Sequence, residues 1–107
     1  MSRLSEALIL PCRLTAPNRI AKAAMTEGLA DPGGVAGARL VRAYTAWAEG
    51  GAGLILTGNI MVDARYRERP ANVVVDGAQD ERARAGLKAY AGAAKAGGGL
   101  AIAQLSH

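Results

Sequence analysis

The chain contains no phenylalanine, only three tyrosines and only one tryptophan, so large aromatic side chains contribute little to its core. Hydrophobic residues still make up 50% of the 107 residues, which is enough for one small domain. Glycine and alanine are abundant instead. Because small side chains gain less free energy from burial than large ones, this composition favours helices packed closely on a sheet over a free-standing minidomain.

Cysteine and long apolar runs are also scarce. Cys12 is the single cysteine, which excludes an internal disulfide and favours a reducing compartment. No apolar run is long enough to cross a membrane, and the one within residues 1–10 is too short for a signal peptide. We therefore expect a cytoplasmic protein with no membrane partner.

The net charge is +4, but the basic residues form no stripe and no aromatic platform accompanies them. We therefore expect no nucleic-acid partner. A weaker alternative is a basic nucleic-acid binder that uses Arg65, Arg67 and Arg69, the one local charge cluster.

The apolar pattern predicts a hairpin followed by alternating strands and helices. The hairpin is expected from Leu8–Leu10 and Leu14-Thr15, on either side of a turn at Pro11. Predicted strands cover Arg19–Met25, Gly53–Asn59 and Leu100–Leu105, and predicted helices run from about Val35 to Glu49 and from an N-cap at Asp80 to about Ala96. Nearly continuous apolar strands of this kind are typical of parallel sheets buried on both faces.

Each predicted helix has one apolar stripe, which is expected to pack on the sheet. The first stripe comprises Leu40, Tyr44, Trp47 and Ala48, and the second comprises Ala83, Leu87, Tyr90, Ala91 and Ala94. The connection from Ile60 to Gln79 shows no obvious secondary structure. A loop of this length is either a solvated surface loop or a lid on the substrate side, and the sequence leaves both open.

Strands that alternate with helices imply a parallel sheet with right-handed crossovers. The glycine pattern of a dinucleotide-binding fold is absent after the first strand, where residues 26–31 read TEGLAD, and no P-loop is present. The three predicted strands each end at, or are followed by, a polar residue: Thr26, Asn59 and Gln104. The C-terminal ends of the strands are the positions at which a β/α barrel carries its catalytic and binding residues. We therefore predict an α/β fold: the first three β/α units of a TIM (β/α)8 barrel preceded by an N-terminal β-hairpin, an incomplete barrel.

Three segments in order resemble the Old Yellow Enzyme family of FMN-dependent NADH:flavin oxidoreductases. The run NRIAKAAMT from Asn18 to Thr26 resembles the first-strand motif, and GGAGLILTG from Gly50 to Gly58 resembles the second strand. The run QLSH from Gln104 to His107 matches the start of the third-strand motif. The resemblance covers the whole chain and implies that residues 1–107 are the N-terminal part of an FMN-binding TIM-barrel oxidoreductase domain.

The resemblance also implies flavin-contacting residues. The backbone at Ala24 and Met25 would pack along the flavin, the Thr26 hydroxyl would bond near the O4/N5 edge, and Gly58 would let the backbone approach the ring. The Gln104 amide would pair with the pyrimidine side of the ring. Apart from the resemblance, Gln104 is expected to be a buried amide, which is costly without a partner and so favours a binding role. Thr26 as a turn residue and Gly58 as a strand-end break remain structural alternatives.

The implied activity is NAD(P)H-dependent reduction of FMN, followed by hydride delivery to an acceptor such as an activated alkene. No catalytic residue and no metal ligand is assigned, because the substrate-anchoring His/Asn or His/His pair of the family cannot be matched and His107 is not its substrate-binding histidine. Many family members have proline at the position of Ala24. The chain alone is expected to be inactive and to bind FMN weakly or not at all. The alternative is a non-catalytic partial barrel that completes itself by self-association or with another chain through open sheet edges.

Overall fold

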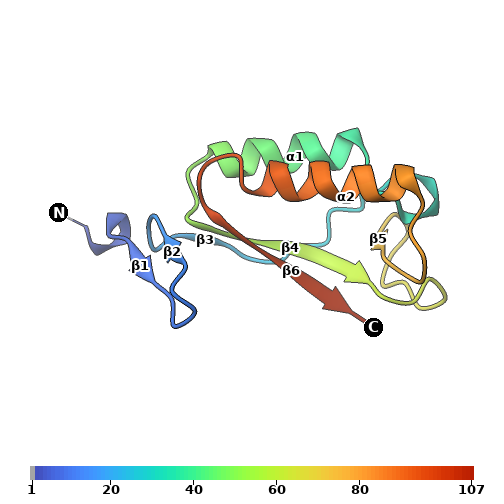
Figure 1. Ribbon diagram of the computed structural model, residues 1–107, viewed down its shortest axis with the longest axis horizontal. Coiled ribbons are helices and arrows are strands. Elements are labelled where there is room, and N and C mark those ends of the chain that lie inside the picture. The colour runs from blue at the N-terminus through green and yellow to red at the C-terminus, as the bar shows by residue number, and fades with distance from the viewer. Residues whose placement is uncertain (1) are drawn as a thin grey trace.

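The computed structural model describes residues 2–107. After a short 3-10 turn, η1 (Arg3–Ser5), strands β1 (Leu8–Ile9) and β2 (Thr15–Ala16) form an antiparallel hairpin. The hairpin lies at one end of the molecule, away from the two helices (Figure 1). The predicted hairpin is therefore confirmed.

The remaining strands form one parallel sheet around β4 (Leu54–Met61). Strand β6 (Leu100–Ser106) pairs along one edge of β4. Strands β3 (Ala21–Lys22) and β5 (Val73–Val74) pair with opposite ends of the other edge. Within residues 2–107 the sheet stays open and does not close into a barrel, as expected for part of a β/α barrel.

The predicted first strand, Arg19–Met25, is wrong in extent, because only Ala21 and Lys22 pair with β4. Asn18 fixes the start of the strand: its Oδ1 accepts hydrogen bonds from the Ile20 and Gly53 amides. The backbone pairing stops at Lys22, and the side-chain ammonium group of Lys22 donates to the Leu56 carbonyl at 3.0 Å. A side-chain bond thus reaches β4 where a longer β3 would have continued its backbone ladder.

Helix α1 (Ala38–Glu49) begins three residues later than the predicted Val35. The preceding 3-10 turn η2 (Pro32–Gly34) contains two glycines with positive φ, and Asp31 forms a β-bridge with Val35. That local pairing holds Val35 in an extended conformation. Helix α2 (Glu81–Ala94) begins as predicted, since the Asp80 carboxylate accepts a hydrogen bond from the Ala83 amide at 2.7 Å.

The two helices lie side by side over one face of the sheet (Figure 1). Helix α2 also lies close to the segment that precedes α1: a Cβ on Gly86 of α2 would lie 2.3 Å from the Ala36 carbonyl oxygen. The stripe of α1 is buried as predicted, with Trp47 partly exposed. The predicted apolar stripe of α2 is wrong at Ala91, because this residue is exposed. The core comprises Ala30, Ala36, Leu40, Tyr44, Ala48, Ile55, Ile60, Val73, Tyr90, Ala93 and Ala94.

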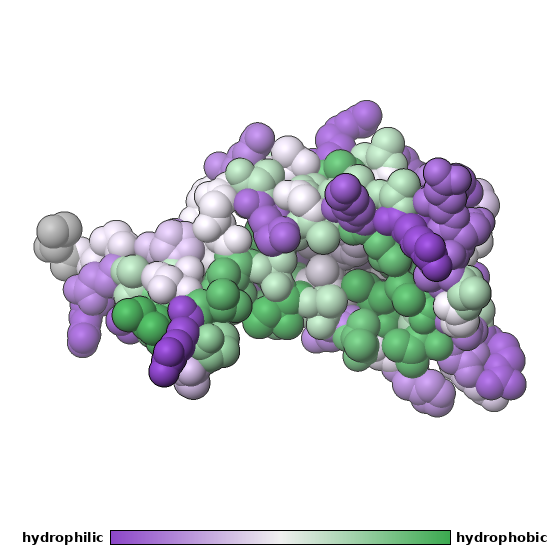
Figure 2. Space-filling view, in the orientation of Figure 1, coloured by the Kyte–Doolittle hydropathy of each residue, from purple (hydrophilic) through white to green (hydrophobic). Residues whose placement is uncertain are grey.

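The opposite face of the sheet is uncovered within residues 2–107, as expected for three strands of an incomplete barrel, which leave one apolar face only partly covered. Leu54, Leu56 and Asn59 of β4 are only partly buried, and Ile102 of β6 is 46% exposed. Figure 2 shows hydrophobic residues along the strand side of the molecule and hydrophilic residues over the outer surface of the helices.

The connection between β4 and α2 has more structure than predicted. Strand β4 continues to Met61, and β5 pairs with its last two residues. Asn72, only 2% exposed, accepts a hydrogen bond from the Arg69 amide at 2.7 Å and so closes the turn before β5. Among residues 2–107, no helix has the length and apolar character needed to span a membrane.

Candidate functional site

The polar residues predicted at the strand ends meet at the end of the sheet where the parallel strands finish. The Nε2 of Gln104 in β6 donates to the Oδ1 of Asn59 in β4 at 2.6 Å. Asn59 and Gln104 are register partners, so their side chains project from the same, open face. The expectation that Gln104 is buried without a partner is wrong: β6 is an edge strand with no helix or strand beyond it in residues 2–107, and Gln104 is exposed.

A β-bulge in β4 brings the two amides together. Leu56 pairs with Ile102 and Asn59 pairs with Gln104, so two residues of β4, Thr57 and Gly58, lie opposite one residue of β6. If the side chains after Leu56 alternated strictly between the two faces of the sheet, the Asn59 side chain would point toward the helices. The extra residue reverses that alternation, which places the Asn59 amide on the open face and Ile60 in the core.

Thr26 joins the same region through the loop that follows β4. Its hydroxyl donates to the Oε1 of Glu68 at 2.5 Å, and the Nδ2 of the buried Asn72 is 3.5 Å from the same oxygen. Hydrogen bonds from Thr26 and then from Asn59 hold the pKa of Glu68 below its ordinary value. Glu68 thus connects the segment after β3 with the end of β4, so part of the charged loop lies over the strand ends.

The other predicted flavin-contacting residues lie on the neighbouring backbone. Ala24 is partly buried and Met25 is 51% exposed. Gly58 is buried, and a Cβ at this position would lie 2.2 Å from the Met25 carbonyl oxygen and 2.8 Å from Glu27 Oε1. The structure therefore requires glycine here for the close approach of two protein segments, whatever else contacts this backbone.

A polar cluster around the buried Tyr44 supports these strand ends from the helix side. The Tyr44 hydroxyl of α1 donates to the Glu27 carboxylate and accepts a hydrogen bond from the Gly58 amide at 2.9 Å. The ammonium group of Lys22 lies 4.8 Å from the centre of the Trp47 ring. Burial lowers the pKa of Lys22, and the negative charge of Glu27 partly opposes that shift.

Sequence reasoning missed the roles of Asn59, Glu68 and Tyr44 in this region. Asn59 was visible as a polar residue at a strand end, but its pairing with Gln104 depends on the bulge. Glu68 belonged to the charge cluster of the long loop, and no pattern indicated its bond to Thr26. Tyr44 was visible only as a member of the helix stripe.

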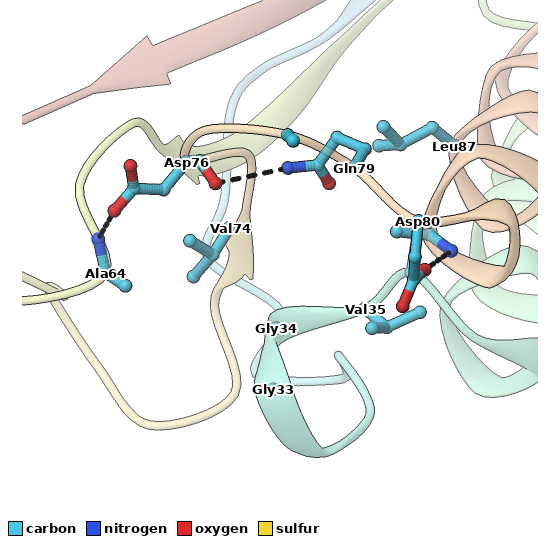
Figure 3. A pocket seen from close by; sticks show the side chains of 12 residues that line it. Gly33, Gly34, Val35, Ala64, Val74, Asp76, Gln79, Asp80 and Leu87 are labelled. Carbon is cyan, nitrogen blue, oxygen red and sulfur yellow. Dashed lines mark hydrogen bonds between the residues drawn. The ribbon is translucent and has the colours of Figure 1, made fainter.

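A separate cavity of about 250 Å³ lies between η2, β5 and the start of α2 (Figure 3). None of the predicted site residues lines it. The Asp76 carboxylate accepts a bond from the Ala64 amide, Asp80 caps α2, and the Gln79 amide donates to the Asp76 carbonyl. These bonds join the segment between β5 and α2 to the loop after β4 and to the first turn of α2.

No family model matches the chain. The chain is 36% identical over 101 residues to the NADH-dependent flavin oxidoreductase iliE of Hypocrea jecorina. This match covers 94% of this chain and 25% of that protein. A structure of morphinone reductase in complex with tetrahydroNAD matches with a TM-score of 0.77 and 27% identity, over 100% of this chain and 28% of that one. The old yellow enzyme from Trypanosoma cruzi matches with a TM-score of 0.75 and 27% identity, over 98% and 27%. The chain therefore spans about a quarter of the length of these proteins.

Proposed function

From the premise that this chain is an N-terminal-like segment of the Old Yellow Enzyme family of NADH-dependent flavin oxidoreductases, we propose that its open sheet face contacts the isoalloxazine ring of FMN. The proposed parent activity is that of an FMN-dependent, NAD(P)H-oxidising reductase that delivers hydride to an activated alkene or a similar acceptor. As the chain covers about a quarter of its relatives, this activity is proposed for a complete barrel and not for the chain alone.

One observation carries the proposal: a solvent-accessible apolar surface ends at an amide pair. Met25, Leu56 and Ile102 are partly or largely exposed near the Asn59–Gln104 pair. A flavin ring is a flat aromatic system with hydrogen-bonding groups along one edge, so it needs an apolar surface beside donors and acceptors. These residues fit that requirement.

The predicted residues take complementary roles in this proposal. The backbone at Ala24, Met25 and Gly58 would pack against the ring, and the Thr26 hydroxyl would bond to its O4/N5 edge. Gln104 would pair with the pyrimidine edge, because a primary amide offers both donors and an acceptor. Bound FMN would supply the hydride chemistry, taking hydride from NAD(P)H and passing it to the acceptor. The protein groups would hold and orient the ring.

The test compares FMN with riboflavin, which has the same ring system and no phosphate. We expect both to shift the side-chain amide resonances of Asn59 and Gln104 in the isotopically labelled chain, with similar weak affinities, because the proposed contacts are all to the ring. No shift with either compound at saturating concentration would overturn the ring contact. Tight, stoichiometric FMN binding with NADH oxidation by this chain would contradict its proposed inactivity.

A second candidate function, self-association, is favoured by the state of β6. All residues from Ala101 to Leu105 are exposed, and Leu105 is 65% exposed. Ala101 and Ala103 line an apolar groove of about 280 Å³ between β6 and α2. An uncovered, uncharged edge strand beside such a groove is a template for pairing with another chain.

A cytoplasmic location and the lack of a nucleic-acid partner remain predictions.

A further inference from the structure

The bulge in β4 displaces two backbone N–H groups from the regular ladder, and a side-chain hydroxyl accepts a hydrogen bond from each. The Gly58 amide donates to the Tyr44 hydroxyl at 2.9 Å, and the Gln104 amide donates to Thr57 Oγ1 at 2.9 Å. Leaving a buried N–H group without a partner would cost roughly 1–3 kcal/mol. The two hydroxyls therefore stabilise the bulged arrangement against a regular register.

Tyr44 is well placed to hold this geometry. It is fully buried, and its ring makes edge-to-face contacts with Trp47 and Tyr90, with centroids 5.0 and 4.8 Å away. Its hydroxyl donates to Glu27, the residue that follows Thr26 by one position. A single hydroxyl thus connects α1, the bulge in β4 and the segment after β3, three parts of the chain that meet at the candidate site.

We propose that Tyr44 and Glu27 are positioning residues that lock the Thr57–Gly58 bulge and thereby direct the Asn59–Gln104 amide pair toward the open face. Without the bulge, Asn59 and Ile60 would exchange faces, and a polar amide would enter the core. The hydroxyl of Tyr44 bonds on the helix side of β4, whereas the amide pair lies on the open side. The two residues therefore act through the strand, and neither needs to touch a ligand.

This inference rests on the proposed function only where it assigns the amide pair to a flavin. The lock, by which we mean the hydrogen bonds of Tyr44 to Gly58 and Glu27 that hold the bulge, is a property of the chain itself. Tyr90 supplies a matched control. Its ring packs against Tyr44, but its hydroxyl has no hydrogen-bond partner among the described residues, although the hydroxyls of Tyr44 and Thr57 and the Glu27 carboxylate are near. Tyr44→Phe and Tyr90→Phe each remove one buried hydroxyl from the same region, and only the first removes a bond to the bulge.

The experiment measures amide hydrogen exchange and side-chain amide resonances in the 107-residue chain. In Tyr44→Phe we expect the Gly58 amide to exchange about ten-fold faster, the size that loss of one buried hydrogen bond implies, and the Asn59 and Gln104 side-chain resonances to shift. Tyr90→Phe should leave both readouts near wild type. Glu27→Gln retains an oxygen acceptor for Tyr44 and should resemble wild type, whereas Glu27→Ala should resemble Tyr44→Phe.

Equal exchange at Gly58 and unshifted amide resonances in Tyr44→Phe and Tyr90→Phe would overturn the lock. So would an effect of Tyr44→Phe that spreads evenly over the core amides, since that is general destabilisation. Flavin titration separates the two proposals. If the lock readouts change as expected while riboflavin leaves the wild-type resonances unmoved, the lock stands and the proposed flavin contact fails.

Discussion

The side-chain amide of Gln104 donates to Asn59 Oδ1 across the β4–β6 pair, so that each amide orients the other on an exposed sheet face. No hydrogen bond within residues 2–107 uses the Gln104 Oε1. That acceptor remains accessible on the open face, beside the exposed side chain of Ile102. An oriented but accessible amide is suited to recognising an edge that presents an N–H group.

Gln104→Ala should separate binding from stability. Because Gln104 is exposed, we expect the free energy of unfolding to change by no more than about 0.5 kcal/mol. The resonance shifts that FMN or riboflavin causes should shrink strongly. Gln79→Ala, which removes the other glutamine from the wall of the separate cavity, is the control and should preserve the flavin response. A flavin response unaltered by Gln104→Ala would exclude this residue from the site.

Gly58→Ala should destabilise the chain by about 1–3 kcal/mol, because the new methyl group would overlap the Met25 carbonyl oxygen and Glu27. Gly92→Ala in α2 is the control. A Cβ there meets no atom within 4 Å, and alanine favours a helix over glycine by about 0.5–1 kcal/mol, so this variant should be more stable than wild type. Urea unfolding followed by circular dichroism measures both changes; equal stability of wild type and Gly58→Ala would disprove the close approach.

Alkaline pH should weaken the fold through Tyr90. Burial raises the pKa of Tyr90 from 10.0 to about 12. The folded state therefore retains the phenol proton more strongly than the unfolded state, and this contribution is complete below pH 10 and is lost as the pH rises toward 12. The Tyr90→Phe variant lacks this contribution. The free energy of unfolding of the wild type minus that of the variant should therefore fall as the pH rises from about 9 to about 12. Urea unfolding of both chains across this range measures the difference; a constant difference would refute the assignment.

Ile102→Lys should reduce self-association if the chain associates through β6. A charge on an edge strand disfavours pairing with a second strand, and residue 102 lies within β6, next to its central residue. Ile9→Lys places the same charge on the exposed side chain of β1 in the hairpin and should leave association unchanged. Analytical ultracentrifugation of the three chains gives the comparison. A monomeric wild type, or an equal effect of both variants, would exclude β6 as the contact.

Local patterns predicted the hairpin, both helices and the strands at the centre and end of the sheet, because their apolar periods and capping residues lie within a few positions of each other. The direction of Asn59 could not be predicted in this way. Alternation from Leu56 turns it toward the helices, and the bulge that reverses it is bonded to Tyr44, 14 residues earlier in the chain. The uncovered face was predictable only from the number of strands, because three strands cannot close a barrel; the apolar strands themselves read the same whether one or both faces are packed.

The hairpin at one end of the molecule has a hydrodynamic consequence. The chain measures 47 × 24 × 22 Å, and its radius of gyration of 14.4 Å exceeds the roughly 13 Å typical of a compact domain of this length. An elongated monomer diffuses more slowly than a sphere of equal mass, so it should elute from a gel-filtration column ahead of globular standards near 10.9 kDa. Early elution would therefore not demonstrate a dimer, and light scattering must supply the mass.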